Sequence, residues 1–165
     1  DHCRESEKSR RPVLRAPAAE AALPGDPLYA VKVGLTEPIK GVLNVSPVAR
    51  AEWDSELLTR RLEEAATLAA HGNLNSNARE AIESQIALKT ETLNQSVANL
   101  KSTEDGVVAA ASVESNLEAS LVGHERVLTG LSIDKPNSAQ EIAPILNKVR
   151  VQAEATNSKR KSSEH

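Results

Sequence analysis

Hydrophobic residues recur at spacings of three, four and seven along most of the chain, with charged residues between them. This period is typical of amphipathic α-helices that bury one face. The pattern predicts three long helices over residues 47–70, 76–101 and 103–130. It then predicts a loop over residues 130–137 and a shorter final helix over 138–157. Alternating patterns are short and bounded by Gly or Pro, so no strand is predicted.

Local signals mark where these helices begin and end. Ser46 followed by Pro47 is typical of a helix start, because a serine side chain caps free amides and proline needs no amide bond there. Gly72 stands where a left-handed residue ends a helix. Ser138 and Glu141 have the spacing of a capping box and predict the start of the final helix.

A shorter segment precedes the long helices. We expect a short helix from Pro27 that carries Leu28, Val31 and Leu35 on one face. Residues that interrupt helices follow, so we expect a break or kink near Glu37. The interrupting residues are Gly34, Pro38 and Gly41.

The elements together predict an all-α fold. Long helices of matched length with short loops pack as antiparallel neighbours. We therefore expect an antiparallel bundle of three long helices and a shorter C-terminal helix, with a short, kinked N-terminal helical segment packed on it. The expected organisation is a tail or linker over residues 1–22, the helical bundle domain over 23–157 and a polar tail over 158–165.

The chain has one tyrosine, one tryptophan, no phenylalanine and no methionine. Its core must therefore consist of Leu, Ile, Val and Ala. We expect Tyr29 and Trp53 to pack against each other's helices and to pin the N-terminal segment to the bundle. The alternative is an exposed aromatic side chain that anchors a partner.

Charge and cysteine content exclude several classes of function. Residues 23–147 carry a net charge of −7, which repels nucleic acid. Cys3 is the lone cysteine, so neither an intramolecular disulfide nor a zinc–cysteine cluster forms. No apolar run reaches the length of a membrane helix, so we expect membrane attachment only through an anchor upstream.

We find no pattern typical of a catalytic, cofactor or metal site, and predict neither an enzyme nor a bound cofactor. Carboxylates are abundant, but we place them on exposed helix faces; they include Glu52, Glu56, Glu63 and Glu64. His124 lies on an apolar seam of the third long helix. We expect it to be partly buried and bonded to a neighbouring helix, and a pH switch is the alternative role.

Three segments resemble a bacterial family known only as a domain of unknown function. Its members begin with P-G-(D/S)-x-L-Y-x-(V/I)-K and continue with P-x-x-R-A-E and R-L-x-E-A. The matching segments here are P-G-D-P-L-Y-A-V-K over 24–32, S-P-V-A-R-A-E over 46–52 and R-R-L-E-E-A over 60–65. The resemblance covers residues 24–72 and departs from the family at Thr36-Glu37-Pro38, where a proline interrupts a basic amphipathic stretch.

The resemblance implies a domain outside the cytoplasmic membrane of a membrane-anchored bacterial protein, similar to the outer parts of anti-sigma-type regulators. We therefore expect a non-catalytic interaction or sensing domain with a protein partner. One alternative is a structural subunit or stalk that self-associates through its helices. A metal-binding or enzymatic bundle is the other.

Overall fold

The computed structural model describes residues 19–43, 46–103 and 105–163. Cys3 and most of the predicted linker lie outside this part of the chain. Every regular element within the described residues is a helix, which confirms the all-α prediction. The helices are α2 (Tyr29–Val31), the π-helix η1 (Lys32–Thr36), α3 (Glu37–Leu43), α4 (Pro47–Ala70), α5 (Ser76–Lys101), α6 (Gly106–Asp134) and α7 (Pro136–Ser163).

The bounds of α4 and α5 are those that the sequence predicts. Ser46 caps α4 through a hydrogen bond from the Ala49 amide to its Oγ, at 3.1 Å. Gly72 follows the end of α4 with a φ of 70° and so adopts the left-handed conformation expected of it. The Asn75 side chain caps α5 by accepting from the Ala78 amide at 3.0 Å.

The C-terminal hairpin differs from the prediction. The expected loop over 130–137 is wrong, because α6 continues to Asp134 and α7 begins at Pro136. Proline suits the first position of a helix, since it has no amide proton to leave unpaired. Ser138 is therefore a buried residue inside α7 and not its cap. The final helix has 28 residues, which is longer than α4 and α5 and one residue shorter than α6, and it continues through Ser163 into the predicted polar tail.

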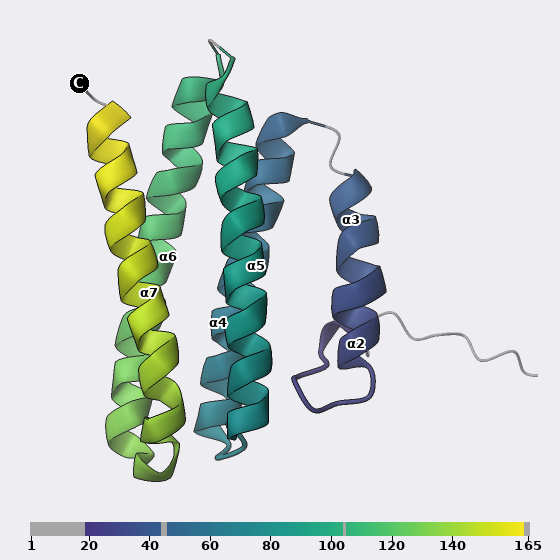
Figure 1. The fold of residues 1–165 in the computed structure, drawn as a ribbon, viewed down its shortest axis with the longest axis vertical. Coiled ribbons are helices and arrows are strands. Elements are labelled where there is room, and N and C mark those ends of the chain that lie inside the picture. The colour runs from purple at the N-terminus through teal and green to yellow at the C-terminus, as the bar shows by residue number, and fades with distance from the viewer. Residues whose placement is uncertain (1–18, 44–45, 104, 164–165) are drawn as a thin grey trace, which may run out of the picture.

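Helices α4 to α7, which we call the body, run up and down side by side as antiparallel neighbours (Figure 1). Within the body, α4 packs mainly on α5 and α6, and α6 packs on α7. The core is aliphatic; its largest fully buried side chains are Leu58, Leu62, Ile82, Leu93, Leu100, Leu121, Leu128, Ile142, Ile145 and Val149. Among the described residues, no helix is both long enough and apolar enough to cross a bilayer.

Residues 29–43, which we call the arm, form a helical column beside the body, on the side opposite α7 (Figure 1). The arm comprises α2, η1 and α3 and stays helical from Tyr29 to Leu43. The irregularity that we expect near Glu37 takes the form of the π-helix, which ends at Thr36. Pro38 is the second residue of α3 and directly follows the π-helix, and it has no amide proton to donate to a carbonyl oxygen of the preceding turn.

Candidate functional site

The arm exposes its large apolar side chains. Leu35 is 56% exposed, Ile39 53%, Val42 74% and Leu43 73%, and Leu28 adds a further 38% just before α2. We call these five residues the apolar stripe. The expectation that the face with Leu28, Val31 and Leu35 packs on the bundle is therefore wrong for both leucines.

The arm buries charged and small residues instead. Lys32, Glu37 and Gly41 are its buried members. In an α-helix, residues five apart differ in direction by about 140°, so Lys32 and Glu37 would face different sides. The π-helix reduces this difference, because its hydrogen bonds join residues five apart, as the Glu37 amide and the Lys32 carbonyl oxygen do. The π-turn therefore places both charges on the side that faces the body.

Arg61 of α4 is the centre of a buried group of polar side chains. Its side chain is 0% exposed. One terminal nitrogen, Nη2, donates to Glu37 Oε1. The other, Nη1, donates to Tyr29 Oη at 3.0 Å and lies 3.3 Å from Glu64 Oε2. One guanidinium thus joins two residues of the arm to one of α4.

Two lysines complete this group. Lys32 Nζ donates to Glu64 Oε1 at 2.5 Å and to the carbonyl oxygen of Ala22 at 3.1 Å. Lys89 of α5 lies 3.7 Å from Glu37 Oε2. We call the six side chains the ionic cluster; they are Tyr29, Lys32 and Glu37 of the arm, Arg61 and Glu64 of α4, and Lys89 of α5. The cluster fixes the arm to both α4 and α5.

Tyr29 takes part in the cluster with its hydroxyl group. It accepts from Arg61 and donates to Glu64 Oε2 at 3.2 Å. Burial raises the pKa of Tyr29 to about 12, and the neighbouring Glu64 carboxylate adds to the effect. The phenol is therefore a neutral hydrogen-bond donor at physiological pH, and it links the arm to α4.

Trp53 contacts the other end of the arm. A Cβ atom added to Gly41 of α3 would lie 3.2 Å from Trp53 Nε1, so any larger residue would require the Trp53 ring to shift by a few tenths of an ångström. Arg50 of α4 also donates to the Gly41 carbonyl oxygen at 3.1 Å. The Arg60 guanidinium lies 5.1 Å from the centre of the Trp53 ring, within the range of a cation–π contact. The two aromatic residues thus lie at the two ends of the contact between arm and body.

The ionic cluster is arranged to fasten the arm and not to transfer protons. Both carboxylates, Glu37 and Glu64, lie against cations. The cluster holds three cations and two carboxylates, so it carries a net charge of +1. Burying charges costs solvation free energy, and pairing offsets this cost only when the geometry is good. Glu37 Oε2 and Arg61 Nε have no hydrogen-bond partner, so the pairing is incomplete.

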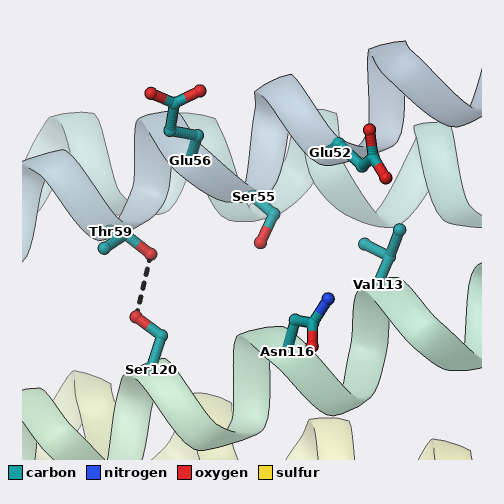
Figure 2. A pocket seen from close by; sticks show the side chains of 7 residues that line it. All are labelled: Glu52, Ser55, Glu56, Thr59, Val113, Asn116 and Ser120. Carbon is teal, nitrogen blue, oxygen red and sulfur yellow. Dashed lines mark hydrogen bonds between the residues drawn. The ribbon is translucent and has the colours of Figure 1, made fainter.

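A polar pocket of about 310 Å³ lies between α4 and α6 (Figure 2). Ser55 and Thr59 of α4 point toward Asn116 and Ser120 of α6, whereas Glu56 points away from α6. Thr59 Oγ1 and Ser120 Oγ share a hydrogen bond of 3.1 Å at one end of the pocket. Glu52 and Val113 also line it.

His124 lies one helical turn beyond Ser120, where it is partly buried. Its Nδ1 lies 2.8 Å from the Ser120 carbonyl oxygen and 3.4 Å from Ser120 Oγ. This carbonyl oxygen can only accept, so Nδ1 must carry the proton and cannot take one from the Ser120 hydroxyl. The pair is therefore not a serine–histidine nucleophile. The expected hydrogen bond to a neighbouring helix is replaced by one within α6.

Most of the ionic cluster was not predicted from the sequence. Glu64 was expected on an exposed face, but it is buried and only 5% exposed. Lys32, Glu37 and Arg61 lie in the segments compared with the family pattern, but neither they nor Lys89 were predicted to be buried, because charged residues at helical spacing are usually solvated. The five-residue spacing of Lys32 and Glu37 is a signal only if a π-turn is assumed. Nowhere in the described part of the chain do three or more His, Cys, Asp or Glu side chains form a group that could hold a metal ion.

Comparison with known proteins gives one match. The sequence model of the family Domain of unknown function (DUF5667) matches residues 21–159, which include the arm and nearly all of the body. No curated protein and no solved structure matches the chain.

Proposed function

Since this chain belongs to the DUF5667 family, whose function is unknown, we propose a role for it from its own geometry. We infer that it is a non-catalytic protein-interaction domain that binds its partner through the apolar stripe of the arm. The observation that carries this proposal is the inverted arrangement of the arm, with charges buried and leucine, isoleucine and valine exposed.

Burying charged side chains and exposing apolar ones costs free energy, and the folding of the arm alone does not explain this cost. Exposed apolar patches of roughly 300–600 Å² on a single protein are often functional surfaces. A segment that only covered the body would turn its leucines inward and its charges outward. Here Lys32, Glu37 and Arg61 hold the arm in the opposite orientation. This supports a surface that is kept in place for a partner.

We also propose a setting for this interaction. The resemblance of residues 24–72 to extracytoplasmic domains of membrane-anchored, anti-sigma-like bacterial proteins supports a place in the cell envelope. In this proposal, the residues before the arm connect it to an anchor upstream, and the bound partner is sensed by the domain. Sequencing the gene upstream of the Asp1 codon tests the setting, because a membrane helix encoded there is the expected result.

Site-specific photo-crosslinking in the native cells tests the interaction surface. A benzophenone amino acid is placed at Ile39 or at Val42 in the full-length protein. The matched control is Val151, which is 59% exposed on α7, on the opposite side of the body (Figure 1). We expect discrete crosslinked species from positions 39 and 42 and none from position 151. The same adducts from all three positions, or no adducts at all, would contradict the proposal.

A further inference from the structure

We propose that the occupant of the apolar stripe is the same stripe of a second copy of this chain, so that two arms pack against each other about a twofold axis. This inference rests on the proposed function and names the partner. In such a contact each residue faces itself or its near neighbours across the axis. Three properties of the stripe fit this arrangement: its lack of charge, its area and its shape.

The outer side of the arm carries no unneutralised charge of its own. Residues 27–43 contain three charged side chains, Lys32, Glu37 and Lys40. The first two are buried in the ionic cluster. Lys40 lies at the edge of the stripe in an ion pair with Glu20. A twofold contact places like groups together, so a charge at its centre would repel its own copy. An uncharged centre with one neutral ion pair at the edge avoids this repulsion.

The same charge pattern argues against two other occupants. A surface that binds an anionic membrane or an acidic protein carries lysine or arginine beside its apolar residues. Here the one cation of the outer side is already paired with Glu20.

The area of the stripe suits a reversible dimer. Fully exposed aliphatic side chains present roughly 150–200 Å² each, so at their observed exposures the five residues offer about 500 Å². Two copies would bury about 1,000 Å², which is the lower limit of specific interfaces. We therefore expect a weak and reversible equilibrium between monomer and dimer.

The shape of the stripe limits the assembly to two copies. The arm is a single convex helical column beside the body (Figure 1). Such a column fits another helix through interdigitating side chains, and Leu35, Ile39 and Val42 have the spacing of four and three that this packing uses. A contact of one surface with itself is closed and does not extend into a filament. This differs from a stalk that grows by repeated contacts.

Sedimentation equilibrium of the full 165-residue chain tests the inference, in a reducing buffer so that Cys3 forms no disulfide between copies. We expect the wild type to dimerise over about 5–500 µM, and the Ile39→Lys variant to bind at least about tenfold more weakly. The matched control, Val151→Lys, introduces the same charge on α7 and should keep the wild-type constant. A second variant, Val42→Lys, should weaken the dimer in the same way.

Trp53 reports whether these variants keep the arm in place. It is the one tryptophan of the chain and lies against Gly41 of α3. Its emission spectrum should be unchanged in Ile39→Lys and Val42→Lys, because both side chains face solvent in the monomer. An unchanged spectrum shows that a lost dimer reflects the lost contact and not a detached arm.

Four outcomes would overturn the inference. A chain that stays monomeric up to about 500 µM has too weak a contact for an interface of this area. If Ile39→Lys and Val151→Lys change the dissociation constant of the dimer equally, the contact between the copies lies elsewhere. Binding of a monomeric chain to phosphatidylcholine vesicles through Ile39 makes a lipid surface the occupant. If the chain is monomeric and position 39 crosslinks to a different protein, a second copy is not the partner. The proposed function would then stand, because the apolar stripe would still bind a protein.

Discussion

The body and the arm are held by opposite kinds of interaction. The body buries leucine, isoleucine, valine and alanine between four antiparallel helices. The arm is attached through the buried charges of Lys32, Glu37, Arg61 and Glu64 and exposes its leucines. Apolar packing has no preferred direction, whereas ion pairs and hydrogen bonds require defined geometry. The body is therefore built for stability, and the arm for a defined orientation.

The first test of this difference is the substitution Arg61→Met. It leaves Glu37 and Glu64 buried without their shared cation, and removing one partner of a buried ion pair costs about 3–5 kcal/mol. We expect this loss in denaturant unfolding followed by circular dichroism. The control is Arg150→Met on α7, whose exposed pair with Glu125 is worth at most about 1 kcal/mol. Equal losses in the two variants would show that the cluster does not hold the arm.

The second test compares the same substitution in the two regions. Leu62→Ala removes a leucine that is 1% exposed in the core and should lower the free energy of unfolding by about 2–5 kcal/mol. Leu35→Ala in the arm should change it by no more than about 0.5 kcal/mol, because this side chain already contacts water. A loss above about 2 kcal/mol for Leu35→Ala, measured on dilute protein, would show that the arm has an apolar core of its own.

The third test uses the single tyrosine. Tyr29 has a pKa of about 12 in the folded chain and an ordinary value of 10.0 when unfolded, so the unfolded state loses its proton first as the pH rises. The stabilisation that comes from the protonated phenol is complete below pH 10.0 and is lost between there and about pH 12. We expect phenolate absorbance to appear near pH 12 in native protein and near pH 10 in urea.

The substitution Tyr29→Phe is the control for that titration. It should remove the part of the stability change that belongs to the phenol. Phenolate absorbance at pH 10 in the native chain would contradict the burial of Tyr29 and, with it, the position of the arm.

The smallest expected effect concerns Gly34 in the π-helix. A Cβ added there would meet no atom within 4 Å, so Gly34→Ala should raise the free energy of unfolding by about 0.5–1 kcal/mol through the lower entropy of the unfolded chain. The control Gly72→Ala should be destabilising, because Gly72 has a φ of 70°. Thermal unfolding of both variants measures the two changes in stability. Destabilisation by Gly34→Ala would show that the π-turn requires glycine.

Sequence patterns predicted the body well and the arm poorly, for a physical reason. Ser46, Pro47 and Gly72 act on the backbone next to them, so the bounds of α4 follow from local chemistry. The inward face of the arm depends on its contacts with Arg61 and Lys89, which lie more than twenty residues away. A prediction from periodicity assumes that apolar residues face inward. The arm does the opposite, because its leucines face solvent and its charges face the body.

The candidate site was predicted in part for the same reason. Tyr29 and Trp53 were singled out by their rarity, and both lie where the arm meets the body. The charges around Tyr29 could not be distinguished from solvated charges before the fold was known. The bounds of α7 were mispredicted because Ser138 has a capping-box pattern, while Pro136 provides an earlier helix start.

The π-helix accommodates one residue more than a regular α-helix would. Val33, Gly34, Leu35 and Thr36 separate Lys32 from Glu37, and a π-turn contains one residue more than the α-turn it replaces. Loss of any one of these four residues would place the two charges four apart, where a regular α-helix keeps them within about 40° of one direction. A regular α-helix with the present spacing would instead separate them by about 140°. The arm can therefore lose one residue from this segment and keep both charges toward the body, provided that the π-turn becomes an α-turn.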